Sequence, residues 1–132
     1  MFLVLYLGCS KDNPDDQTPI IEPEVVEAYE ALNVSYGSDE NQVFDIYLPE
    51  NRTTSTKTII LIHGGSWVSG DKSDMNTIKS FISTLHPNVG IINMNYTLAG
   101  VNNPPVPMQT EDISAVVDYL STNKSSPMLI CY

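Results

Sequence analysis

The chain has 132 residues, 42% of them apolar, which is enough for one small domain with its own core. Its 16 acidic residues outnumber the 6 basic ones and give a net charge of −10. This balance argues against binding to nucleic acid, which requires basic patches, and against electrostatic attachment to an anionic bilayer.

The N-terminal residues MFLVLYLGC form a short apolar run that ends at Gly8 and Cys9. Such a run is too short to span a bilayer and is typical of a secretory signal. A cysteine after a small residue resembles a bacterial lipoprotein signal, in which that cysteine is lipidated and becomes the new N-terminus. The alternative is an ordinary apolar N-terminus with an inert Cys9. No Lys or Arg precedes the run, so the true start could also lie upstream of Met1.

Residues 10–24 are rich in Asp, Glu and Pro and contain few large apolar side chains. Such a segment cannot bury enough surface to offset the entropy of ordering, so we expect an acidic, flexible tether. Together with Cys9, it resembles the tether of surface-exposed lipoproteins in the Bacteroidetes group. This implies an exported protein of the bacterial outer membrane or cell surface, held to the membrane only through its lipid anchor. The folded domain is expected over residues 25–132.

Two alternating segments open this domain, ALNVSYG at 31–37 and NQVFDIYLP at 41–49. Turn-forming residues join them, so the pair predicts an antiparallel hairpin. The next apolar segment, TIILI at 58–62, is continuous rather than alternating. Continuous β-branched and aliphatic residues are typical of a strand covered on both faces.

A helix is predicted over residues 73–86, where apolar residues recur at helical spacing. Ser73 or Asp74 could cap this helix, and Pro87 would end it. Its apolar positions are Ile78, Phe81, Ile82 and Leu85.

A second buried strand is predicted at 89–96, a second helix at 110–123 with Thr110 as its cap, and a third buried strand at 127–132. The apolar stripe of this helix comprises Ile113, Val116, Val117 and Leu120. Strands that alternate with helices after an opening hairpin predict an α/β fold, whose sheet is antiparallel at one edge and parallel inside.

The segment HGGSW, residues 63–67, comes directly after the apolar strand and before a loop and a helix. Acyl transfer places negative charge on the former carbonyl oxygen, and two backbone N–H groups aimed at that oxygen stabilise it. Glycine allows the backbone to approach a ligand without an intervening Cβ. The HGGG-type loop of lipases and esterases has this arrangement. The alternative is a simple glycine turn beside a buried Trp67.

The motifs DIYLP, HGGSW, NYTLAG and EDISAVVDYL occur in this order within residues 30–125. They resemble the N-terminal half of the esterase/lipase group of α/β-hydrolases, close to carboxylesterases and feruloyl-esterase-like domains. The resemblance implies the N-terminal portion of an α/β-hydrolase fold and hydrolysis of carboxylic esters through a serine acyl-enzyme, with no metal or cofactor. Small esters or acylated carbohydrates would be the substrates of the intact parent.

By their positions in this resemblance, Gly65 and Ser66 would donate the two N–H groups of the oxyanion hole. Gly64 would set the turn of the loop. His63 and Trp67 would brace the loop and perform no chemistry.

The family's nucleophile stands in a G-x-S-x-G pentad, and the acid and base follow it in the chain. No such pentad occurs in this sequence. We therefore expect the nucleophile, acid and base to lie beyond Tyr132, and we expect the chain to be an inactive piece of a hydrolase, truncated before the nucleophile elbow. Asp112 is expected to make a structural hydrogen bond, and Cys131 to be a small buried apolar residue. The residues to which we assign no catalytic role are His63, His86, Asp112, Asp118 and Cys131.

Two other kinds of parent have similar hydrolase domains, namely prolyl-oligopeptidase-like peptidases and aryl formamidases. A different class of function is a non-catalytic pseudo-hydrolase or a surface binding module.

We expect Cys9 to be the lipidated N-terminus when the chain is expressed in a bacterial host. Labelled palmitate supplied to the cells should enter the protein, and Cys9→Ala should abolish the label. Cys131→Ala is the matched control and should retain it. Equal labelling of the unaltered and Cys9→Ala chains would reject this prediction.

Overall fold

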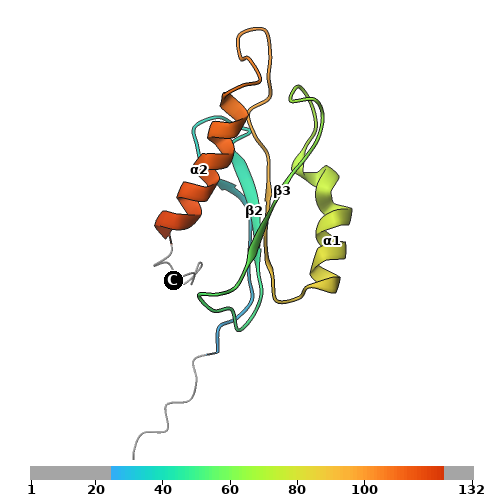
Figure 1. Cartoon of the computed structure of the whole chain (residues 1–132), viewed down its shortest axis with the longest axis vertical. Helices are drawn as coiled ribbons and strands as arrows, with labels where there is room; N and C mark the ends of the chain where they lie inside the picture. Colours follow the sequence, from blue (N-terminus) through green and yellow to red (C-terminus); the bar gives the residue numbers. More distant parts are fainter. Residues whose placement is uncertain (1–24, 124–132) are drawn as a thin grey trace, which may run out of the picture.

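The computed structural model describes residues 25–123, which form one four-stranded sheet with a helix on each face (Figure 1). The strands are β1 (Tyr29–Ser35), β2 (Val43–Leu48), β3 (Thr58–Ile62) and β4 (Gly90–Met94). The helices are the short 3₁₀ helix η1 (Lys72–Met75), α1 (Asn76–Leu85) and α2 (Met108–Thr122). In the view of Figure 1, α1 and α2 lie on opposite sides of the sheet.

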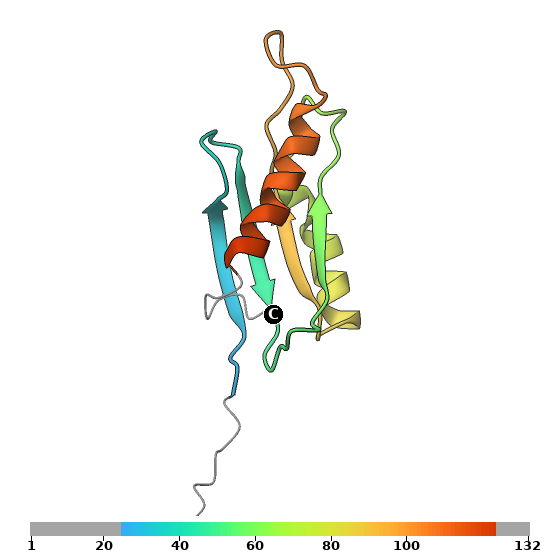
Figure 2. The ribbon, with the colours of Figure 1, turned by 60° about the vertical axis from the view of Figure 1, so that its left-hand side comes forward.

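The strand order is β1-β2-β4-β3, which Figure 2 shows face-on. The predicted hairpin of β1 and β2 is confirmed, because these strands pair antiparallel. β2 also pairs antiparallel with β4, whereas β3 and β4 are parallel. The predicted mixed α/β sheet with an antiparallel edge is therefore confirmed, and its parallel pair lies at the opposite edge of the described sheet.

The core lies between the sheet and α2. Alternate residues of β2 and β4 point to this face, as expected for a strand period of two. Phe44 is fully buried and contacts the ring of Tyr119 of α2 edge-on, with ring centroids 5.4 Å apart. The buried members of this cluster are Phe44, Ile46, Leu48, Ile92, Met94, Tyr96 and Val116.

The other face of the sheet is covered less completely. The ammonium group of Lys79 lies 4.1 Å from the ring centroid of Tyr47, so α1 contacts β2 partly through a cation–π interaction. The helix α1 is amphipathic, as predicted, but three residues of its apolar stripe are exposed. The exposed fractions of Ile78, Phe81 and Leu85 are 47%, 63% and 56%. The helix exists as predicted, but α1 buries none of its residues in the described part of the chain.

The prediction that the strand at 58–62 is covered on both faces is wrong for the described part of the chain. One face of β3 is covered incompletely, because Ile59 is 36% exposed although Leu61 on the same face is buried, and β3 is also an edge strand. By contrast, all five residues of β4 are buried, and β4 lies inside the sheet with a strand on each side.

The helix caps differ from those predicted. Asp71, not Ser73 or Asp74, is the N-cap of η1, and the Asp74 carboxylate accepts a hydrogen bond from the Asp71 N–H in return. Such a reciprocal arrangement satisfies two of the free donors at a helix start. Thr110 lies inside α2, where its hydroxyl donates to the carbonyl of Pro107 rather than capping the helix.

Several predictions fall outside residues 25–123. These concern the signal segment with Cys9, the acidic tether, the strand expected at 127–132 and Cys131. Within the described part of the chain, no helix has the length and apolarity needed to cross a membrane.

Phe44→Ala should lower the free energy of unfolding by about 3–5 kcal/mol, because it removes a fully buried aromatic ring. Phe81→Ala is the matched control, and its effect should stay within about 0.5 kcal/mol because that ring is largely exposed. Urea unfolding followed by circular dichroism would measure both. A large loss for Phe81→Ala would show that the outer face of α1 is buried in solution.

Candidate functional site

Residues 63–67 follow the carboxyl end of β3 and begin the loop that leads to η1. Gly65, Ser66 and Trp67 have consecutive left-handed φ angles of 113°, 53° and 69°. The next two N–H groups both donate to the carbonyl of Gly65, at 3.1 and 3.2 Å, and close the turn. Left-handed φ is strained for a side chain as large as tryptophan, so surrounding contacts must hold this turn.

The glycines of the loop differ in what the backbone demands of them. A Cβ on Gly65 would lie 1.8 Å from the carbonyl oxygen of Ser69, and one on Gly70 would lie 2.5 Å from Nδ1 of His63. A Cβ on Gly64 would meet nothing within 4 Å. The turn that we predicted at Gly64 is therefore made at Gly65, and Gly64 faces open space.

Both rings that flank the glycines contact the same residue, Tyr96. His63 is buried and stacks on the Tyr96 ring, with centroids 4.3 Å apart and an interplanar angle of 12°. Trp67 is 41% exposed and meets Tyr96 edge-on at 5.7 Å. The carbonyl of Trp67 also accepts a hydrogen bond from the Ala99 N–H at 2.7 Å.

The Tyr96 hydroxyl donates to the backbone of the loop. It lies 3.1 Å from the carbonyl oxygen of His63 and 3.3 Å from that of Gly64. Burial raises the pKa of the phenol, so Tyr96 stays protonated and able to donate at neutral pH. Nδ1 of His63 lies 2.7 Å from the same Gly64 oxygen. Because a carbonyl only accepts, Nδ1 carries the proton.

Lys72 anchors the far end of the loop. Its ammonium group lies 2.7 Å from both carboxylate oxygens of Asp45 on β2. Its N–H donates to the side chain of Asn95 at 2.6 Å, and its carbonyl accepts from the side chain of Asn93 at 2.7 Å. The backbone and the charged group of Lys72 are thus all tied to β2 and to the end of β4.

Asp71 adds an electrostatic anchor beside Lys72. Its carboxylate accepts hydrogen bonds from Ser73 and Asn95, which lower its pKa to about 2. The folded protein therefore favours the ionised form. This contribution to stability is complete above the ordinary pKa of about 3.9 and is lost as the pH falls through the folded value.

The loop presents unused hydrogen-bond donors. Within residues 25–123, no acceptor is hydrogen-bonded to the N–H groups of residues 64–67, and all four residues are exposed. Successive free backbone N–H groups in a left-handed turn attract an anion or a developing oxyanion. Gly64, Gly65 and Ser66 are therefore placed where an oxyanion could be bound, and their role as donors stays a prediction.

The other residues singled out in the sequence analysis have structural or surface positions. Asp112 makes the structural hydrogen bonds predicted for it, accepting from the Thr97 N–H and from the side chain of Gln42, both at 2.7 Å. His86 is the exposed C-cap of α1, and Asp118 is exposed on α2. In the part of the chain that the structure describes, no serine or cysteine is hydrogen-bonded to a histidine ring.

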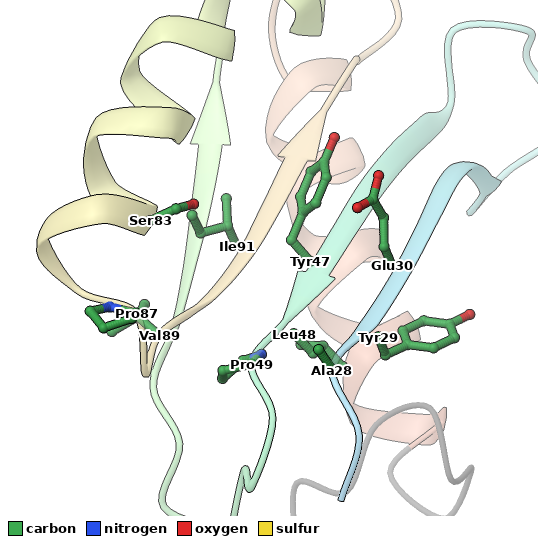
Figure 3. Close-up of a pocket in the computed structure, with 10 residues that line it drawn as sticks. All are labelled: Ala28, Tyr29, Glu30, Tyr47, Leu48, Pro49, Ser83, Pro87, Val89 and Ile91. Carbon is green, nitrogen blue, oxygen red and sulfur yellow. The ribbon is translucent and has the colours of Figure 1, made fainter.

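A separate cavity of about 290 Å³ lies between the β1–β2 hairpin and the end of α1 (Figure 3). Its lining is mainly apolar, with Glu30, Ser83 and two tyrosines as the polar contributors. It includes Val89, which precedes β4, so it lies at the amino end of the parallel strands. In open α/β sheets, ligands bind at the carboxyl ends, which favours the loop at 63–67 as the functional site.

Sequence reasoning did not identify four of the residues that hold this loop. They are Asp45, Lys72, Asn93 and Tyr96. Tyr96 was part of a recognised motif, NYTLAG, but nothing local indicated where its hydroxyl donates. Asp45 offered a weak signal, because a carboxylate within an otherwise apolar and aromatic strand needs a partner if it is buried.

Comparisons with known proteins show which family and which solved structures this chain is similar to. A family model described as BD-FAE matches residues 44–127. Kynurenine formamidase from Salmo salar is 28% identical over 75 residues, which cover 57% of this chain and 25% of that protein.

Two solved structures are also similar. A truncated form of carbohydrate esterase from gut microbiota has a TM-score of 0.61 and 25% identity, covering 79% of this chain and 36% of its own. A phosphonate-inhibited esterase B from Lactobacillus rhamnosis has a TM-score of 0.52 and 25% identity, covering 77% of this chain and 32% of its own. The chain thus spans about a third of these structures and a quarter of the formamidase.

Gly65→Ala should destabilise the fold by about 1–3 kcal/mol, since it forces a side chain into a left-handed conformation against a backbone oxygen. Gly64→Ala is the matched control and should change the free energy of unfolding by no more than about 0.5 kcal/mol. Urea denaturation of both variants would measure the difference. Equal losses would contradict the assignment of the turn to Gly65.

Proposed function

The chain belongs to the BD-FAE family, and on that premise we propose that residues 63–67 are the oxyanion-binding loop of a carboxylic ester hydrolase. The family and the solved neighbours are esterase-like α/β-hydrolases. The observation that carries the proposal is the row of exposed, unused N–H groups at 64–67, directly after the carboxyl end of β3.

In this proposal, Gly65 and Ser66 donate to the oxygen of the substrate carbonyl as it becomes negatively charged. Because their N–H groups have no acceptor in the described residues, this interaction breaks no hydrogen bond within that part of the chain. One such donor contributes about 3–4 kcal/mol to lowering the barrier in serine hydrolases. Gly64, with open space where a Cβ would point, leaves room for the acyl group.

The nucleophile, acid and base of the proposed reaction are not supplied by these 132 residues, which contain no G-x-S-x-G pentad. We propose that the complete enzyme forms a serine acyl-enzyme in which this loop binds the oxyanion. Small esters or acylated carbohydrates are the proposed substrates, a choice supported by the carbohydrate esterase among the structural neighbours. Lipidation at Cys9 and export to the cell surface are part of the same proposal.

An aryl formamidase is the second candidate, supported by the similarity to kynurenine formamidase over 75 residues. Hydrolysis of a formamide also passes through a tetrahedral oxyanion, so the same loop would serve it. The two candidates differ in substrate and not in the geometry of residues 63–67.

The 132-residue chain by itself should not hydrolyse esters. An oxyanion hole without a nucleophile accelerates ester hydrolysis only slightly over the uncatalysed reaction in water. We expect no release of nitrophenol from short-chain nitrophenyl esters above a buffer blank, with an intact serine esterase as the positive control. Saturable hydrolysis that persists through extensive purification would overturn this expectation.

Sequencing the transcript past codon 132 would separate the classes of function. An in-frame strand followed by G-x-S-x-G would support the hydrolase, whereas hydrolase-like strands without the pentad would support the pseudo-hydrolase or binding module. Assays of a product that carries the pentad, on nitrophenyl acetate and on an aryl formamide, would then separate esterase from formamidase.

A further inference from the structure

We propose that Tyr96 is a positioning residue that fixes the orientation of the peptide planes on either side of Gly64. The importance of Tyr96 for catalysis rests on the proposed function, whereas its effect on the orientation of these peptide planes does not. The inference comes from the direction of three hydrogen bonds and from the planarity of the peptide bond.

The Tyr96 hydroxyl lies within hydrogen-bond distance of two successive carbonyl oxygens, at 3.1 Å from His63 and 3.3 Å from Gly64. Nδ1 of His63 holds the Gly64 oxygen from a second direction at 2.7 Å. Both donors belong to buried side chains. The two carbonyl groups therefore point into the protein, toward Tyr96.

In a trans peptide, the C=O of one residue and the N–H of the next lie in one plane and point in opposite directions. An inward carbonyl at His63 therefore turns the Gly64 N–H outward. An inward carbonyl at Gly64 likewise turns the Gly65 N–H outward. A Cβ added at Gly64 would meet nothing within 4 Å, so there is open space for a ligand beside this residue.

The second proposed donor is oriented differently. The carbonyl of Gly65 accepts hydrogen bonds from Val68 and Ser69, so it is held by the turn itself. The Ser66 N–H points away from that carbonyl for the same reason of planarity. Tyr96 and His63 together thus orient the donor at Gly65, and the turn orients the donor at Ser66.

A side chain is needed to fix the Gly64–Gly65 peptide plane, because steric repulsion alone does not fix its orientation. Two adjacent glycines have few forbidden conformations, so the Gly64–Gly65 peptide can rotate at little steric cost. Rotation would turn the Gly64 carbonyl toward the ligand side and remove a donor from it. The hydrogen bonds from Tyr96 and His63 oppose this rotation, because they exist only while the carbonyl points inward.

Tyr96 is itself held firmly. Its neighbour Asn95 is tied to Lys72 and Asp71 through both side-chain atoms, and its neighbour Thr97 donates from its N–H to the buried Asp112. The Tyr96 ring contacts the rings of both His63 and Trp67. The hydroxyl is therefore presented from a rigid base.

Tyr36 provides the matched control. Its hydroxyl also donates to a backbone carbonyl, that of Asn95, at 2.9 Å, and burial followed by the charges of Asp112 and Asp39 raises its pKa. It makes no contact with residues 63–67 among the interactions of the described chain. Tyr36→Phe and Tyr96→Phe thus remove similar hydroxyls, but only Tyr96→Phe removes a hydrogen bond made directly to residues 63–67.

The experiment uses the isotope-labelled 132-residue chain and measures N–H residual dipolar couplings and relaxation dispersion by NMR. Tyr96→Phe should change the couplings of Gly64 and Gly65 and introduce microsecond-to-millisecond exchange there, while β4 and α2 keep their values. Tyr36→Phe should leave residues 64–67 unchanged. Identical couplings and no exchange in Tyr96→Phe would overturn the proposal.

The unaltered chain supplies a second test if Tyr96→Phe does not fold. The amide protons of Gly64 and Gly65 should exchange rapidly with water, although their neighbours His63 and Tyr96 are buried. Slow exchange at Gly65 would overturn the proposal. The positioning role and the proposed function can be separated. If Tyr96→Phe reorients the Gly64–Gly65 peptide but the longer protein with a G-x-S-x-G pentad does not hydrolyse esters, the positioning role is retained and the proposed function is rejected.

Discussion

The buried end of β4 determines the arrangement of the carboxyl edge of this sheet. β4 is paired on both sides and buried along its whole length, so the residues that leave it start from a fixed position. Asn93, Asn95, Tyr96 and Ala99 each donate a hydrogen bond to the segment that follows β3, and together they reach its start, middle and end. The loop has little regular structure of its own and takes its shape from this neighbouring segment.

The ion pair of Lys72 and Asp45 is the most costly of these anchors. Both side chains are largely buried, with 13% and 9% exposure, so both charges have lost most of their hydration. Such pairs often give little net stability, because desolvation offsets the attraction. The additional hydrogen bond from the Asn33 N–H to Asp45 reduces the cost, and the pair serves chiefly to fix η1 in one place.

The hydrophobic pattern predicted the elements well because it depends on local period. The alternation at Val43–Leu48 and the continuous run at Thr58–Ile62 gave the correct strands, and the 3.6-residue period gave both helices. The same pattern could not show what covers an apolar face, so the exposure of Phe81 was not foreseen. The hydrophobic period identifies which face of a helix or strand is apolar, but it does not show which element covers that face.

The site was predictable only in part for a related reason. HGGSW marked the loop because its glycines and its place after a strand are local features. The contact of Tyr96 with Gly64 joins residues 32 positions apart, and its geometry exists only after the sheet has formed. That the turn is made at Gly65 and not at Gly64 likewise depends on φ angles that the letters GG cannot distinguish.

The bulge in β1 has a consequence for strand register. Pairing with β2 is interrupted between Ala31 and Val34, and Asn33 adopts a left-handed φ of 54° that directs its N–H to the Asp45 carboxylate at 2.9 Å. β1 is an edge strand, and edge strands slip easily because a neighbour holds them on one side only. A slip of one residue would withdraw this donor from a buried charge. The carboxylate that secures the loop therefore also locks the alignment of the outermost strand, so hairpin register and site geometry are selected together.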